Sequence, residues 1–122
     1  MTGDMLSQHF SRKEFECPHC GKCEVDPDLI DSLEKLRAVL GKPIIVHSGY
    51  RCPEHNAAVG GAHGSEHMEG KAADISVQGL ALWQLKLAAV QVPRFAEGGI
   101  GSYPQDGHLH LDVRANPARW SG

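Results

Sequence analysis

The sequence predicts an α+β fold in which helices pack on an antiparallel sheet of about four strands. Apolar residues recur at three- and four-residue spacing between residues 27 and 40, which predicts an amphipathic helix. Polar and apolar residues alternate from His108 to Val113, which predicts a strand with one polar face. The expected order along the chain is helix, strand, helix, strand, helix, strand, strand, and this order indicates an α+β domain.

The first half of the chain contains the clearest helix signal. The helix expected at residues 27–40 has a proline near its first position and ends at Gly41. The run 43–47 contains three adjacent β-branched residues, so we expect a buried strand there. A short helix around residues 53–59 follows, and a loop rich in glycine and histidine then covers residues 60–64.

The second half begins with a strand and a helix. The short apolar run at residues 72–77 predicts a strand that carries Asp74. Residues 80–90 predict a helix, and we expect Trp83 to lie in the core as part of its apolar stripe. The stripe consists of Leu80, Trp83, Leu87 and Val90.

Two strands close the expected fold. The glycine-rich segment 98–103 predicts a strand that turns at residues 104–107. The alternating segment that begins at His108 follows this turn directly. Because so short a connection joins them, we expect the two strands to be antiparallel neighbours.

Composition narrows the class of protein. With 122 residues, 41% of them hydrophobic, we expect one domain over residues 1–122, on which the Cys- and His-rich segment 1–26 packs. A net charge of −3 without a run of Lys or Arg argues against nucleic acid as a partner. No apolar leader or membrane-spanning run is visible, so we expect a cytoplasmic protein as synthesised, without membrane insertion and monomeric.

Three residues predict an open zinc site. His67, Asp74 and His110 offer two imidazoles and a carboxylate, which are donors that zinc accepts. Three protein ligands leave a fourth position for water, and this distinguishes catalytic from structural zinc. His108 and Asp112 share the polar strand face with His110, which is hard to explain as a solvated edge. The chemistry that this pattern favours is hydrolysis.

Several short motifs support this interpretation together. They are Ser48-Gly49-Tyr50-Arg51-Cys52-Pro53, Val59-Gly60-Gly61-Ala62, Ser65-x-His67, Gly70-x-Ala72-x-Asp74, Gly99-Ile100-Gly101 and His108-x-His110-x-Asp112-x-Arg114. Jointly, over about residues 27 to 114, the set resembles the zinc D-alanyl-D-alanine carboxypeptidases and LAS peptidases. The resemblance implies a hedgehog-like α+β fold, one zinc ion per domain and cleavage of peptidoglycan stem peptides.

The same resemblance implies roles for individual residues. The predicted zinc residues match the three ligands of the family, and Arg51 matches an arginine that holds the substrate carbonyl or carboxylate. A guanidinium suits this task because its planar fork of donors fits an oxyanion. The alternative for Arg51 is a salt bridge to Asp112 or Glu54. Ser65 resembles a residue that supplies a hydrogen bond beside the zinc, but it could instead cap a turn.

The general base departs from the common pattern of the family. Several branches have a glutamate three residues before the last ligand, where this chain has Gly107. His108 matches the branch with a His-x-His arrangement, and its ordinary pKa near 6.5 suits proton transfer or oxyanion stabilisation. Asp106 is a second candidate base, although a turn also favours aspartate there. We expect Asp112 to orient Arg51 or a ligand histidine.

The four cysteines allow three interpretations. Cys17, Cys20 and Cys23 begin with the spacing of a structural zinc knuckle, and Cys52 could complete a four-thiolate set. A second, structural zinc ion is therefore one prediction. One or two disulfides would suit a protein that acts on the cell wall, and free thiols remain the third interpretation.

The expected function is a zinc peptidase that cuts bacterial peptidoglycan peptides, foremost a D-Ala-D-Ala carboxypeptidase or endopeptidase. An L-Ala-D-Glu endopeptidase of the phage-endolysin type is the alternative in the same class. A non-catalytic, zinc-stabilised wall-binding or structural module is the alternative from a different class, because the glutamate base is missing. A protein made in the cytoplasm would reach the wall after a release of the phage-lysis type.

Overall fold

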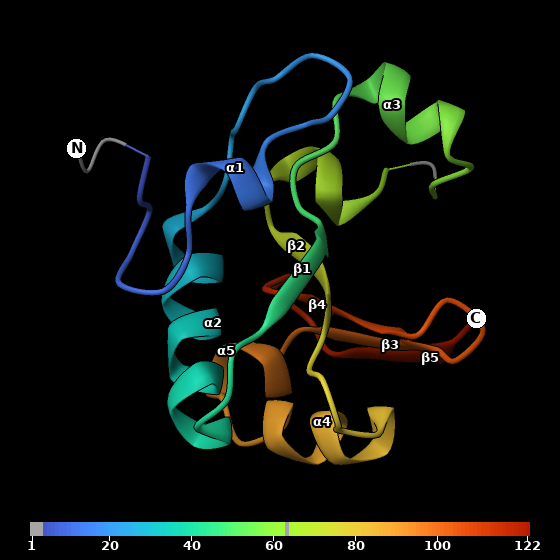
Figure 1. The fold of residues 1–122 in the computed structure, drawn as a ribbon. Coiled ribbons are helices and arrows are strands. Elements are labelled where there is room, and N and C mark those ends of the chain that lie inside the picture. Colours follow the sequence, from blue (N-terminus) through green and yellow to red (C-terminus); the bar gives the residue numbers. More distant parts are fainter. Residues whose placement is uncertain (1–3, 63) are drawn as a thin grey trace.

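The computed structural model describes residues 4–62 and 64–122 (Figure 1), so position 63 of the expected 60–64 loop lies outside the described residues, as do the first three residues of the N-terminal segment. The helices are α1 (Arg12–Phe15), α2 (Pro27–Leu40), α3 (Pro53–Ala58), the 3-10 helix η1 (Glu66–Glu69), α4 (Leu82–Ala89) and α5 (Pro93–Ala96). The strands are β1 (Ile45–Ser48), β2 (Ala72–Ser76), β3 (Gly99–Tyr103), β4 (His108–Asp112) and β5 (Ala118–Ser121).

The strands form one sheet in the order β1-β2-β4-β3-β5. The pairs β1–β2, β2–β4 and β4–β3 are antiparallel, and β5 adds to β3 in parallel. The predicted α+β class is confirmed, including the antiparallel hairpin of β3 and β4. The sheet differs from the predicted one because β5, which the sequence pattern did not reveal, makes it five-stranded and mixed within the described residues.

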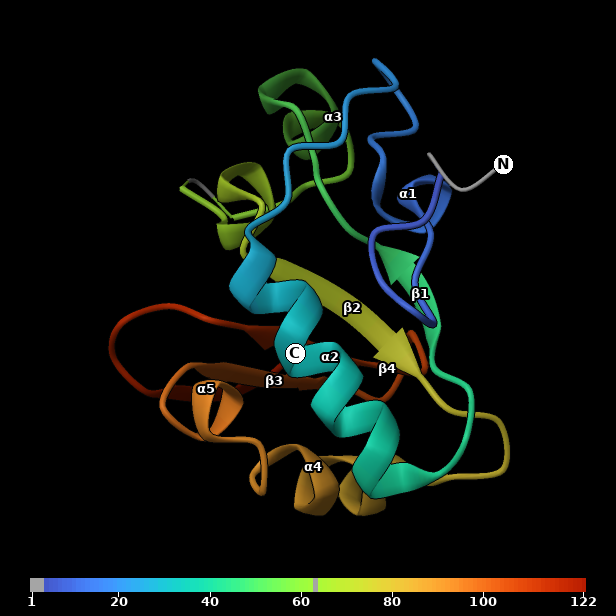
Figure 2. The same cartoon turned by 90° about the vertical axis from the view of Figure 1, so that its left-hand side faces the viewer.

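Helix α2 has the bounds that the sequence predicted. The Asp26 side chain accepts a hydrogen bond from the Asp28 amide, and Pro27 occupies the first turn, where no donor is needed. Gly41 ends the helix in the left-handed conformation at φ 65°. The face that includes Leu29 and Leu33 is buried, and Figure 2 shows α2 lying across β2.

Strand β1 is not the buried strand that was predicted. It lies at the edge of the sheet, where Ile45 remains 46% exposed and the burial of successive residues alternates. The preceding Ile44 is buried, and Val46 packs against the core. A run of β-branched residues thus predicted the strand but not its position, because β-branched side chains fit any pleated, half-buried surface and do not by themselves indicate where in the sheet it lies.

Helix α4 exposes the stripe that was expected in the core. Trp83 is 65% exposed, and Leu87 is 58% exposed. The helix buries Leu85, Ala88 and Ala89 instead. Small alanines let the helix backbone approach the core closely, whereas bulky residues on that face would need more space. The prediction for Trp83 is therefore wrong.

The two faces of the sheet differ in chemistry. Helices α2, α4 and α5 cover one face (Figures 1 and 2), against which the sheet buries Ile75, Ile100, Leu109 and Leu111. The opposite face carries Asp74 and the polar residues of β4, because successive side chains of a strand alternate between the faces. In the part of the chain that the structure describes, no helix has the length and apolar character needed to cross a bilayer.

Candidate active site

The register of the sheet brings the predicted ligands together. Asp74 of β2 lies opposite His110 of β4, and His110 lies opposite Gly101 of β3. The same row continues to Ser48 of β1 and to Trp120 of β5. A single line across all the strands therefore carries two of the three predicted metal ligands.

His67 reaches this row from η1. The Ser65 hydroxyl accepts a hydrogen bond from the His67 amide at 3.1 Å, which begins the helix, and Gly70 ends it in the left-handed conformation. The ring Nδ1 donates to the Gly49 carbonyl at 2.8 Å. Ser65 thus caps the turn, and the Gly49 carbonyl orients the imidazole.

The Nε2 atom of His67 is an orphaned buried group. It lies 3.3 Å from Asp74 Oδ2 but makes no hydrogen bond within the described residues. Because the Gly49 carbonyl can only accept, Nδ1 carries the ring proton of neutral His67, and Nε2 presents a lone pair. A lone pair that faces a carboxylate oxygen is unfavourable unless a cation lies between them.

His110 lies between two carboxylates. Its Nε2 is 2.8 Å from Asp112 Oδ2, and its Nδ1 is 3.1 Å from Asp74 Oδ1. Burial lowers the pKa of His110, but the hydrogen bonds to Asp112 and Asp74 outweigh burial and raise it overall. With Nε2 donating to Asp112, the Nδ1 atom is the one that can hold a metal.

Asp112 orients His110, as predicted, but it does not contact Arg51. It is fully buried and accepts hydrogen bonds from the Gly99 amide at 2.8 Å and from Arg114 Nη2 at 2.7 Å. Burial alone raises the pKa of Asp112, but the bonds to His110 and Arg114 lower it well below its usual range. Gly99 is required at this position, because a Cβ atom there would collide with the Asp112 carboxylate.

Asp74 contacts His67, His110 and Arg51. Burial raises the pKa of this carboxyl, but the neighbouring imidazoles of His110 and His67 keep it far below its usual range. Arg51 Nη2 also lies 3.1 Å from Asp74 Oδ2. Asp74 is therefore a carboxylate at any physiological pH, which a metal ligand must be.

The set of donors fits zinc. His67, Asp74 and His110, here called the active-site cluster, each offer a ligand atom, and these atoms lie within 4.8 Å of one another. Two imidazole nitrogens and one carboxylate oxygen match the donors of catalytic zinc sites, which leave a fourth position open. His67 Nε2 lacks a hydrogen-bond partner among the described residues. The other ring nitrogen of His67 bonds to the Gly49 carbonyl, and that of His110 bonds to Asp112. Both observations support a zinc site.

Arg51 belongs to the same site, and the alternative partners expected for it are wrong. It bonds to Asp74 and not, among the described residues, to Asp112 or Glu54. Its Nε donates to Ser48 Oγ and its Nη1 to Asn56 Oδ1, both at 3.2 Å. These bonds hold the guanidinium against the pocket.

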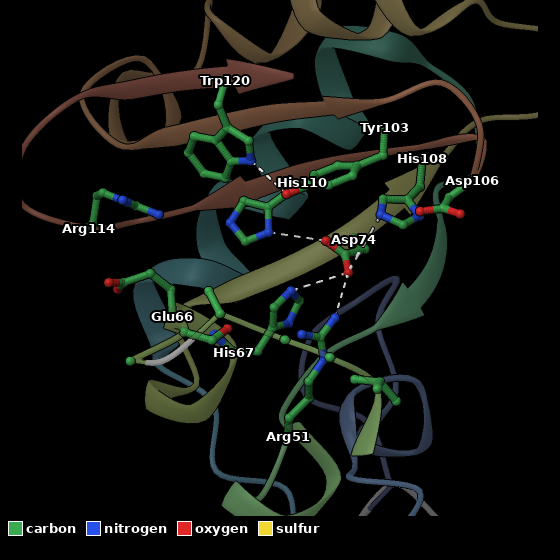
Figure 3. Close-up of a pocket in the computed structure, with 16 residues that line it drawn as sticks. Arg51, Glu66, His67, Asp74, Tyr103, Asp106, His108, His110, Arg114 and Trp120 are labelled. Atoms are coloured by element: carbon green, nitrogen blue, oxygen red, sulfur yellow. Dashed lines mark hydrogen bonds and ion pairs between the residues drawn. The ribbon is translucent and has the colours of Figure 1, made fainter. Parts of the chain in front are cut away.

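His108 and Asp106 lie beside the cluster (Figure 3). His108 Nε2 is 3.8 Å from Asp74 Oδ2, and its ring is 5.2 Å from the ring of Tyr103. Burial lowers the pKa of His108 below its ordinary value, although Asp74 and Asp106 partly oppose this. His108 is therefore neutral and able to accept a proton near pH 7. Asp106 lies in the exposed turn and lines the pocket.

The active-site cluster opens into a pocket of about 570 Å³. Trp120, Tyr103, Arg114 and Glu66 also line it, and sequence patterns gave no role to any of them. Trp120 Nε1 donates to Tyr103 Oη at 2.7 Å, and the indole lies 5.0 Å from the His110 ring. Gly101 makes room for the indole, because a Cβ atom at this position would collide with it.

Three of the four cysteines lie close together, and the fourth lies apart from them. Cys17, Cys20 and Cys52, here called the cysteine cluster, have sulfurs within 4.8 Å of one another, whereas Cys23 lies outside this group. None of the four cysteines forms a disulfide. Burial raises the pKa of Cys17, but hydrogen bonds from the backbone of Cys52, Cys20 and His19 lower it to about 7.

An α+β sheet that presents two imidazoles and a carboxylate at a pocket, beside a third imidazole, has the construction of a metal-dependent hydrolase. The chain belongs to the peptidase M15 family, whose model matches residues 8–112. This match confirms the resemblance drawn from the motifs.

Two relatives are similar over most of the chain. Peptidoglycan L,D-endopeptidase MepK of Escherichia coli (strain K12) is 36% identical over 102 residues, which cover 78% of this chain and 53% of that protein. Probable peptidoglycan L,D-endopeptidase MepK of Haemophilus influenzae is 32% identical over 108 residues, or 81% of this chain and 55% of that protein. The chain thus spans about half the length of the curated relatives it matches.

Proposed function

We propose that this chain is a zinc endopeptidase that hydrolyses a bond between an L- and a D-residue in peptidoglycan peptides. The observation that carries the proposal is the buried His67 lone pair aimed at the Asp74 carboxylate, at the base of a pocket. The names of the relatives support peptidoglycan as the substrate and an L,D bond as the target.

The active-site cluster would hold the zinc ion through His67 Nε2, an Asp74 oxygen and His110 Nδ1. When bound, zinc supplies Lewis-acid polarisation of a carbonyl and lowers the pKa of a water molecule toward neutrality. Asp112 keeps the Nδ1 atom of His110 directed at the site through its bond to Nε2. The Gly49 carbonyl does the same for Nε2 of His67.

His108 is the proton carrier in this proposal. Its lowered pKa leaves the imidazole neutral near pH 7, so it can accept a proton from the attacking water. The imidazolium formed lies 3.8 Å from Asp74 and can return the proton to the leaving amine. No glutamate is required at position 107 for this cycle, and Asp106 contributes by opposing the pKa depression of His108.

Arg51 is the residue that holds the substrate. Three of its five N–H donors are used by Ser48, Asn56 and Asp74. The remaining donors are available to a substrate carbonyl or carboxylate in the pocket. The wall formed by Trp120 and Tyr103 offers an aromatic surface beside the same space, which would orient the peptide chain.

The D-Ala-D-Ala carboxypeptidase activity expected from the sequence is the second candidate. It shares the zinc chemistry, but the Escherichia coli and Haemophilus influenzae relatives both carry the name L,D-endopeptidase. The two activities differ in their products, since a carboxypeptidase releases a single terminal D-alanine and an endopeptidase separates two peptide fragments.

Mass spectrometry of purified peptidoglycan incubated with the zinc-loaded chain tests the proposal. We expect new fragment ends at an L,D bond with the unmodified chain and none with His110→Ala. His9→Ala is the matched control, because His9 bonds to Glu34 outside the pocket. Release of D-alanine alone would favour the carboxypeptidase. Absence of any product from several wall types would favour the non-catalytic module.

A further inference from the structure

The cysteine cluster lies outside the active site and takes no part in the proposed reaction. We propose that it is a second zinc site, in which Cys17, Cys20 and Cys52 and the imidazole of His19 form a closed, structural set of four ligands. The three sulfurs lie within 4.8 Å of one another. His19 Nδ1 lies 3.3 Å from the sulfur of Cys52.

The first two ligands come from one tight turn. The Gly21 amide donates to the Cys17 carbonyl at 2.7 Å, and the Cys17 amide donates to the Lys22 carbonyl at 2.7 Å. Gly21 has φ 76°, which a glycine adopts without strain. This closed turn directs the Cys17 and Cys20 sulfurs to the same side, as the C-x2-C spacing requires in zinc knuckles.

The third ligand comes from the start of α3. The Cys52 amide donates to the Cys17 sulfur at 3.5 Å, and the His55 amide donates to the Cys52 sulfur at 3.4 Å. Backbone donors that point at sulfur stabilise the negative charge a thiolate brings to a metal. The sulfurs of Cys17 and Cys52, which lie far apart in the sequence, therefore belong to one hydrogen-bond network.

The spacing of His19 and Cys52 fits a tetrahedral ion. With Zn–S near 2.3 Å and Zn–N near 2.0 Å, a tetrahedron separates two sulfurs by about 3.8 Å and a sulfur from a nitrogen by about 3.5 Å. The observed 3.3 Å between His19 Nδ1 and Cys52 Sγ is close to the second value. Thiolates with one imidazole select zinc over harder cations such as magnesium or calcium.

Cys23 is not the fourth ligand, contrary to the sequence-based prediction. It packs against the main hydrophobic core, whereas Cys17 and Cys52 pack with Tyr50 in a separate small cluster. The spacing alone favoured four cysteines because His19 lies inside the C-x2-C turn and has no separate motif. His19 takes this place in the proposal because its Nδ1 contacts the Cys52 sulfur.

The site connects the N-terminal segment to the loop that carries Arg51. The two segments run side by side beside α3 (Figures 1 and 2). The Tyr50 amide donates to the Phe15 carbonyl at 2.8 Å, and a Cβ atom on Gly49 would lie 2.6 Å from Phe15 Cα. Zinc at the cysteine cluster would therefore position Arg51, which follows Tyr50 and precedes the ligand Cys52.

Zinc content measured by plasma mass spectrometry after purification in zinc tests the proposal. We expect two equivalents in the unmodified chain and one each in Cys17→Ser and His110→Ala. Cys23→Ser is the matched control and should keep two. His19→Ala should release its second zinc to a chromophoric chelator faster than Cys23→Ser does. Two equivalents in Cys17→Ser, or equal release from His19→Ala and Cys23→Ser, would overturn the proposed ligand set.

Cobalt substitution of His110→Ala keeps the test independent of whether Cys17→Ser folds. Cobalt bound by thiolates gives a sulfur-to-metal charge-transfer band in the near ultraviolet, which imidazole and carboxylate ligands do not give. We expect this band in His110→Ala, whose active-site cluster is disabled. Its absence, or an intact mass that is 2 Da lower from a disulfide, would overturn the second site while leaving the proposed peptidase unaffected.

Discussion

The active-site cluster takes two donors from neighbouring strands β2 and β4 and the third from η1, whereas the cysteine cluster takes its donors from a turn and from the start of α3. The first contains three ligands and opens into a pocket, whereas the second contains three sulfurs and, with His19 as proposed, would offer four ligands. The difference matches that between catalytic zinc, which keeps an open position, and structural zinc, which does not.

The two clusters also differ in what holds them in place. In the active-site cluster, buried charges bond to one another, and Asp112, Arg51 and Arg114 support the arrangement. In the cysteine cluster, a few backbone hydrogen bonds and a small apolar group hold the turn. Metal loss should therefore abolish chemistry at the first and loosen structure at the second.

The largest expected effect separates two histidines of the same strand. His110→Ala should remove the active-site zinc and all peptidase activity, because it deletes a ligand. His108→Ala should lower kcat by about 10²- to 10⁴-fold with zinc retained, because it deletes only a proton carrier. Zinc analysis and rate measurements on the same samples check this. Equal zinc loss in both variants would contradict the separate roles of ligand and proton carrier.

Removal of the Asp112 charge, which bonds to His110 Nε2, should have the next largest effect. Asp112→Asn keeps the size of the side chain but loses the negative charge that bonds to Nε2. Zinc affinity at the active-site cluster should fall by about 10- to 100-fold, as for other supporting carboxylates. Competition with a chelator of known affinity measures the change. Unchanged affinity would show that the His110 orientation does not depend on this bond.

Metal loss at the cysteine cluster should have a smaller and local effect. In Cys17→Ser, hydrogen exchange should become faster in residues 14–23 and 49–56, while β2 and β4 stay protected. The activity should fall without being abolished, because Arg51 is less well positioned. Hydrogen-exchange mass spectrometry checks this against Cys23→Ser. Uniform loss of protection along the chain would contradict the local role.

The smallest effect concerns Glu34 and is electrostatic. Burial raises the pKa of Glu34, but hydrogen bonds from Ser7 and His9 lower it below its ordinary value overall. A depressed folded-state pKa gives stability that is fully present above the unfolded pKa and is lost as the pH falls through the folded value. Denaturant titrations should therefore show a shallower acid loss for Glu34→Gln than for the unmodified chain, with Glu54→Gln as the control.

Strand periodicity made much of the active site predictable. The alternation of β4 directed His108, His110 and Asp112 to one face, and the short run of β2 did the same for Asp74. These patterns involve residues that are close together along the chain, so they can be recognised from the sequence alone. The partner of Arg51 was not predictable, because the pairing with Asp74 depends on how β1 and β2 meet.

Features that depend on how separate segments pack together were also missed. The strand β5 alternates apolar and polar residues over only four positions, which is too short a run to indicate a strand, so neither the strand nor the contact between Trp120 and Tyr103 was visible. The buried face of α4 was misassigned because bulky residues on one side competed with alanines on the other. His19 was missed as a ligand because its partner sulfur lies 33 residues away along the chain.

An anomalous difference map, recorded at the zinc absorption edge from crystals of the unmodified chain grown with zinc, tests the central claim most directly. We predict one peak between His67 Nε2, Asp74 and His110 Nδ1 with the pocket side open, and a second peak enclosed by three sulfurs and His19. A map without the first peak, in which Asp74 still bonds directly to both histidines, would contradict the assignment of the active site.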